Sequence, residues 1–194
     1  MLSFFISNNC CHIYSERMMQ IHKVAEQHKI ADLIPLFLSA ELQSVDNLDK
    51  VIFSLGPLTF TTVRIVNSVI KALKIAHPNT RFIGVSNFLT YSYVARGNCN
   101  CDVIAINSYR GDFYCRSITN KALSDQVTAT MDEIKQKYQN PLFDTDLSLS
   151  DKNLAFAQYA SLYEYEWGKS EKLICETTDI EYAFTPIYRK LGGQ

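Results

Sequence analysis

A strand, a tight turn, a long helix and a second strand follow one another in the middle of the chain, and this unit constrains the fold most. Val51 to Leu55 reads as a strand, and the Gly56-Pro57 pair is a turn signal. The apolar spacing then predicts a helix from Phe60 to Ala76 and a strand from Arg81 to Val85. Strands and helices that alternate in this way indicate an α/β domain.

Three short β-prone runs precede this unit, and a helical pattern connects them to it. The runs extend from Leu2 to Ile6, from Cys11 to Tyr14 and from Arg17 to Ile21. From about Val24 to Leu42 apolar residues recur at intervals of three and four, which predicts a helix. The predicted order up to the second strand of the central unit is therefore β-β-β-α-β-α-β.

A third helix, from the residue after Ser86 to about Ala95, leads into a second unit. The elements predicted there are strands at Asp102 to Asn107 and Asp112 to Ile118, a helix at Ala129 to Tyr138, a strand near Leu142, and a helix at Lys152 to Trp167. We therefore expect two small subdomains, residues 1–98 and a reduced second one at residues 99–194.

Composition and charge restrict the classes of function. The 194 residues are 47% hydrophobic and 20% charged, which is enough apolar material for a packed core. A net charge of -1 gives no global positive field, so we do not expect strong binding of tRNA by the chain alone. No apolar run approaches the roughly 18 residues of a membrane span, and the six cysteines do not form a disulfide framework. We expect a cytoplasmic chain with reduced thiols and no membrane partner.

The helices predicted at residues 24–42 and 60–76 carry more apolar surface than one buried face requires. In the second of them, one apolar line is joined by an adjacent line formed by Ile65, Val69, Ala72 and Ala76. We predict that another protein covers the extra surface. The predicted interface residues are Ile30, Leu33, Ile34, Phe37, Val63, Val66, Ile70 and Leu73. The alternative is that the second half of this same chain covers both helices.

The Gly-Pro turn has the position of a phosphate-binding loop but not its composition. Gly56 can adopt positive φ, and Thr59, Thr61 or Thr62 can cap the helix. A phosphate loop needs glycines where the backbone approaches the anion, and Leu58 and Thr62 place Cβ atoms there. A turn that serves only the fold is the favoured interpretation, and nucleotide binding is the alternative.

The segment GPLTFTTVRIVNSVIKAL, followed by FIGVSNF, resembles the signature of the bacterial tRNA threonylcarbamoyladenosine biosynthesis family TsaB (YeaZ-type). The residues that match in register are Gly56, Pro57, Phe60, Thr61, Val63 and Arg64, with Thr59 in place of serine. Further similarity lies at IAINSYRGDFY and at the terminal PIYR. The chain departs from the family at Ser54, Leu58 and Thr62, where glycine is usual, and at Ser7-Asn8, where an Asp-Thr pair is common.

This resemblance implies an actin-like ATPase (ASKHA, ribonuclease H-like) fold and a non-catalytic subunit without a cofactor. The implied partners are a TsaD-type catalytic homologue and a TsaE-type ATPase, and tRNA is reached only through the complex. That complex transfers threonylcarbamoyl to N6 of adenine 37 in tRNAs that read codons beginning with A. A homodimer is expected for the chain alone. The alternative is a small actin-like kinase or ATPase that binds nucleotide between the subdomains.

Two other constellations carry less weight. Cys10, Cys11 and His12 with Cys99 and Cys101 could supply zinc ligands, but adjacent residues of a strand point to opposite faces. His22 and His28 are six apart and do not share a helix face, so a metallopeptidase is not predicted.

The remaining candidates are cations. Arg64, in the first turns of its helix, is expected to have a specific partner, which is a carboxylate, a backbone carbonyl, a ligand or another subunit. The C-terminal cations are expected to be solvated, with tRNA contact as the alternative, and they are Lys169, Lys172, Arg189 and Lys190.

Overall fold

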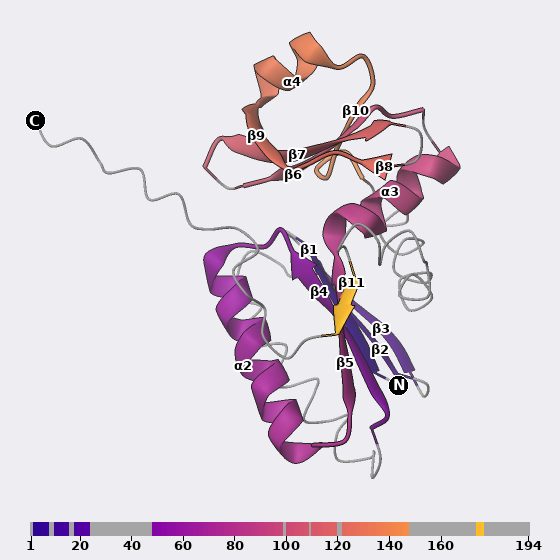
Figure 1. Cartoon of the computed structure of the whole chain (residues 1–194), viewed down its shortest axis with the longest axis vertical. Coiled ribbons are helices and arrows are strands. Elements are labelled where there is room, and N and C mark those ends of the chain that lie inside the picture. The colour runs from indigo at the N-terminus through magenta and orange to yellow at the C-terminus, as the bar shows by residue number, and fades with distance from the viewer. Residues whose placement is uncertain are drawn as a thin grey trace, which may run out of the picture.

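The structure is a computed structural model that describes residues 2–7, 10–15, 18–23, 48–98, 100–108, 110–119, 122–147 and 174–176. Two sheets lie one above the other in Figure 1, and a helix runs from the first toward the second. The predicted helices at residues 24–42 and 152–167 lie outside the described residues.

The first sheet is mixed and six-stranded, with the order β11-β5-β4-β1-β2-β3. Its strands are β1 (Leu2–Ser7), β2 (Cys10–Ser15), β3 (Met18–Lys23), β4 (Lys50–Gly56), β5 (Arg81–Ser86) and β11 (Ile174–Glu176). The first three form an antiparallel meander, and β1, β4 and β5 run parallel to one another. The predicted meander and both strands of the central unit are therefore confirmed.

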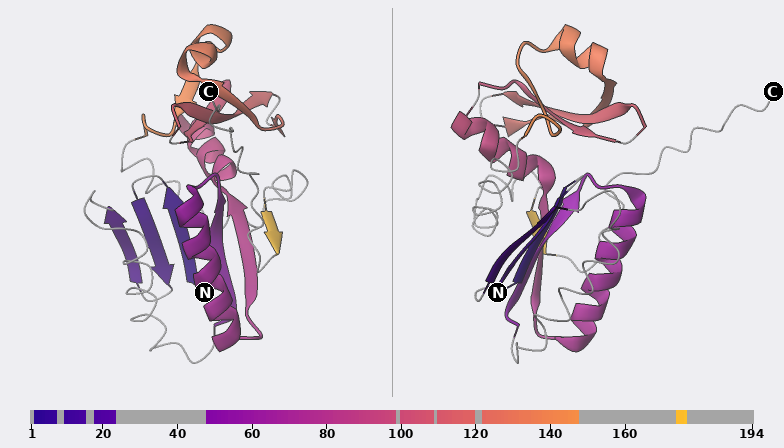
Figure 2. Two further views of the ribbon diagram at one scale, coloured as in Figure 1. Left: turned by 90° about the vertical axis from the view of Figure 1, so that its left-hand side faces the viewer. Right: turned by 180° about the vertical axis from the view of Figure 1, so that it is seen from behind.

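Two helices follow the parallel strands of this sheet. Helix α2 (Phe60–Ala76) has the predicted bounds and lies against one face of the sheet, as Figure 2 shows from behind. Two hydrogen bonds fix the C-terminal end of α2. The His77 N–H donates to the Leu73 carbonyl at 2.8 Å, and Lys74 Nζ donates to the Pro78 carbonyl at 2.7 Å. Helix α3 (Asn87–Asn98) starts directly after β5 and leads to the second sheet.

The second sheet is five-stranded, with the order β10-β6-β7-β8 and β9 paired to β7. Its elements are β6 (Val103–Asn107), β7 (Asp112–Thr119), β8 (Ala122–Leu123), β9 (Val127–Thr130), helix α4 (Met131–Lys137) and β10 (Pro141–Phe143). Both Asp102 carboxylate oxygens accept backbone N–H groups, from Gln139 at 2.9 Å and from Asn140 at 3.2 Å. This carboxylate holds the connection after α4 against the start of β6.

The predicted helix from Ala129 to Tyr138 begins too early, because β9 occupies Val127–Thr130 and pairs with β7. The boundary is a capping box: Thr130 Oγ1 accepts the Glu133 N–H at 3.3 Å, and Glu133 accepts the Thr130 N–H at 2.7 Å. The Thr130 N–H and the Thr130 hydroxyl, the latter at 2.9 Å, both donate to the Glu133 carboxylate and lower the pKa of Glu133.

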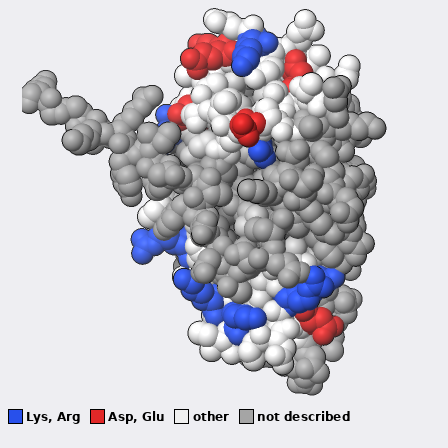
Figure 3. All heavy atoms as spheres, in the orientation of Figure 1, with Lys and Arg blue, Asp and Glu red and all other residues white. Residues whose placement is uncertain are grey.

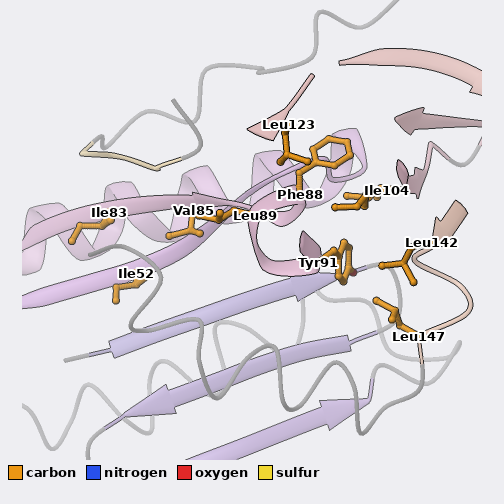
Figure 4. Packing of buried hydrophobic residues seen from close by; sticks show 11 residues of the cluster. Ile52, Ile83, Val85, Phe88, Leu89, Tyr91, Ile104, Leu123, Leu142 and Leu147 are labelled. Atoms are coloured by element: carbon orange, nitrogen blue, oxygen red, sulfur yellow. The ribbon is translucent and has the colours of Figure 1, made fainter. Parts of the chain in front are cut away.

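One hydrophobic cluster connects the two sheets (Figure 4). Helix α3 contributes Phe88, Leu89 and Tyr91, which are at most 2% exposed and lie between side chains of both sheets. The other members are Ile52, Ile83 and Val85 from the first sheet and Ile104, Ile106, Leu123, Leu142 and Leu147 from the second half. The halves predicted at residues 1–98 and 99–194 therefore share a core, and β11 also joins the second half to the first sheet.

Gly84 in β5 lies against the side chain of Leu55 in the neighbouring strand β4. A Cβ added there would lie 2.4 Å from Leu55 Cδ2 and 2.6 Å from Leu55 Cγ. We expect Gly84→Ala to lower the free energy of unfolding by about 1–3 kcal/mol, because the overpacked side chain must shift. Urea denaturation measures this change.

A double-mutant cycle with Leu55→Ala is the control, because it removes the atoms that clash. We expect a coupling energy of at least about 0.5 kcal/mol in favour of the double variant. Equal costs of Gly84→Ala in both backgrounds would show that the contact with Leu55 is not the cause.

Candidate functional site: the Gly-Pro turn and helix α2

The Gly-Pro turn lies where β4 ends and α2 is about to begin. Gly56 has a φ of 104°, so it supplies the positive φ expected of this turn, and the Gly56-Pro57 peptide is cis. Both residues are buried. The turn is therefore an internal part of the fold, flanked by the starts of α2 and α3.

Side chains from β4 and from the start of α3 hold the turn in place. Asn87 is 1% exposed; its Nδ2 donates to the Pro57 carbonyl at 3.3 Å, and its Oδ1 accepts from Ser54 Oγ at 2.5 Å. Ser86 Oγ donates to the Gly56 carbonyl at 3.4 Å and accepts the Phe88 N–H at 3.3 Å. The last residue of β5 and the first residue of α3 thus anchor the turn after β4.

Thr59 is the residue that caps α2. Its Oγ1 accepts the Thr62 N–H at 3.2 Å and lies 2.8 Å from Thr62 Oγ1, while its carbonyl accepts the Val63 N–H at 2.9 Å. Thr62 is buried, and its hydroxyl takes part in this cap. Of the three threonines considered as caps, Thr61 instead lies on the exposed side of the helix.

These contacts determine what the turn can do chemically. An anion site at a helix N-terminus needs donors that point at the ligand. Here the polar side chains of Ser54, Ser86 and Asn87 bind the turn or one another. The arrangement supports the interpretation of a structural turn. Within the described part of the chain, no group of three His, Cys, Asp or Glu residues could hold a metal ion.

Arg64 lies on the exposed side of α2, and its contact differs from the expected carboxylate or carbonyl. Its guanidinium carbon lies 5.7 Å from the centroid of the Phe60 ring, and Phe60 is itself 46% exposed. A cation over an aromatic face at this distance is a cation–π contact. The spacing of four residues along one helix could have predicted it.

The predicted partner interface requires a correction on α2. Val63, Val66, Ile70 and Leu73 are 0–6% exposed, so they form the inner face of the helix. The expectation that these side chains lie on an uncovered surface is therefore wrong. Their burial follows from spacings of three and four residues, which place them on one face. The other predicted interface residues lie outside the described residues, and they are Ile30, Leu33, Ile34 and Phe37.

The outer side of α2 carries the second apolar line instead. Ile65 and Val69 are half-buried, and Ala72 and Ala76 are exposed. Ile75, which the sequence pattern did not single out, is 84% exposed. We call the exposed and half-buried set Thr61, Ile65, Ser68, Ala72 and Ile75 the α2 outer ridge.

The other sequence candidates are only partly described. The C-terminal cations and Cys99 lie outside the described residues, and only the backbone of Cys10, Cys11 and His12 is described. Cys101 is half-buried, and Cys115 is buried in the second sheet. Desolvation by burial raises the pKa of Cys115 to about 11, against a smaller lowering effect of Lys137.

The two mixed sheets and their helices define an α/β fold, and comparison with known proteins specifies it. No family model and no curated protein matches the sequence. Among solved structures the chain is similar to YeaZ from Pseudomonas aeruginosa, with a TM-score of 0.54 and 18% identity, over 88% of this chain and 93% of that chain. A second similar structure is an uncharacterized protein with similarity to peptidase YEAZ from Pseudomonas aeruginosa. It has a TM-score of 0.53 and 18% identity, over 82% of this chain and 91% of that chain.

The chain therefore shares its fold with these YeaZ-type structures. The likeness to YeaZ-type proteins inferred from the loop and helix motifs is confirmed at the level of the fold. No helix in the described part of the chain has the length and apolar character needed to cross a membrane.

Replacing Asn87 by alanine tests the anchoring of the turn. We expect Asn87→Ala to lower the free energy of unfolding by about 1–3 kcal/mol, because buried polar groups of Ser54 and Pro57 lose a partner. The matched control is Ser68→Ala, which removes an exposed hydroxyl bonded to the Arg64 carbonyl. It should change stability by less than about 0.5 kcal/mol. Equal effects in urea denaturation would contradict the anchoring role.

The raised pKa of Cys115 predicts an unreactive thiol. The thiolate is the nucleophile, so at pH 8 we expect iodoacetamide to label Cys101 but to leave Cys115 unlabelled until urea unfolds the chain. Any stability due to the neutral Cys115 thiol is complete below pH 9.0 and is lost as the pH rises toward 11. Peptide mass spectrometry identifies the labelled site, and similar labelling of both cysteines in the folded chain would refute the prediction.

Proposed function

We propose that this chain is a non-catalytic subunit of a tRNA threonylcarbamoyladenosine modification complex. The chain binds a TsaD-type catalytic subunit and either stabilises or activates it. The observation that carries the proposal is the YeaZ-like fold over 88% of the chain, together with the matching Gly-Pro turn. A TsaE-type ATPase joins the complex. This chain reaches tRNA only through the complex, and it acts in the cytoplasm.

The polar contacts of the turn favour a scaffold over an ATPase. Nucleotide binding at a turn between a strand and a helix relies on backbone and side-chain donors directed at phosphates. The side-chain amide of Asn87 and the hydroxyl of Ser86 are engaged with turn carbonyls instead. Leu58 is half-buried at a position where the family usually has glycine.

The outer side of α2 is the part of the proposed interface that the described residues can supply. The α2 outer ridge combines small side chains with the 84% exposed Ile75, so another helix can approach it closely. Ile30, Leu33, Ile34 and Phe37 of the preceding predicted helix remain the second part of the proposed interface. Val63, Val66, Ile70 and Leu73 instead position the helix from inside.

Removal of the chain from its host cell tests the function directly. We expect tRNAs that read codons beginning with A to lose the threonylcarbamoyl group at adenine 37, which mass spectrometry of digested tRNA detects. Re-expression of the chain should restore it. Unchanged modification in the deleted strain would reject the proposal.

The alternative function is a small actin-like kinase or ATPase. Calorimetry with ATP and magnesium separates the two functions. We expect no heat of binding at micromolar protein, because the turn offers no phosphate cradle. Binding with a micromolar Kd would favour the enzyme.

Substitution on the α2 outer ridge tests the interface. We expect Ile75→Glu to weaken binding to the catalytic subunit at least about tenfold, or about 1.4 kcal/mol, because a charge is placed in an apolar contact. Calorimetric titration measures the Kd. Met131→Glu on α4 is the matched control, because Met131 is also an exposed apolar residue, 38% exposed, on a different element. A Kd that changes equally in both variants would place the interface elsewhere.

A further inference from the structure

We draw no further inference here: the strongest candidate, the surface patch of Lys and Arg side chains that Figure 3 shows on the lower half of the molecule, around α2, carries none because its cations already interact within the chain, namely Lys50, Arg64, Lys71, Lys74 and Arg81.

Discussion

The burial of the first part of helix α3, residues 87–92, between the two sheets is the interaction on which the rest of the structure depends. Phe88, Leu89 and Tyr91 contact core residues from both sheets, so the sheets share one core on the sides that face this helix. A fold built from two sheets with separate cores could open between them. Here the shared core opposes such a motion. The same helix also provides Asn87 at its first position, so the segment that unites the sheets also fixes the turn before α2.

Much of the order of elements could be predicted from the sequence because the signals were local. Helix α2 was predicted from Phe60 to Ala76 and has those bounds, since Thr59 caps it and Pro78 follows it closely. The strands of the meander and the hairpin of β6 and β7 were also predicted. The short strand β11 (Ile174–Glu176) was missed, because three residues have no periodicity and are held by pairing with β5, almost ninety residues away in the sequence.

The candidate site was predicted less well, for a physical reason that α2 illustrates. Two apolar lines on one helix show that two surfaces need cover, but they do not show which line faces the sheet. The line containing Val66 and Ile70 was assigned to a partner, and it is the line that the chain itself buries. Likewise, the bond between Ser54 and Asn87 joins residues 33 apart, and no spacing rule links them. The contact between Phe60 and Arg64, in contrast, could have been predicted, because the two residues are four apart in one helix.

The anchoring of one loop by the first residues of the next helix has a consequence for how this chain can vary. Asn87 bonds at once to the hydroxyl of Ser54 and to the carbonyl of Pro57, so three segments depend on a single amide. A glycine at position 54, which is usual in the YeaZ-type family, offers no hydroxyl to that amide. Serine at 54 and asparagine at 87 are thus expected to change together among related chains, and loss of either alone should be rare.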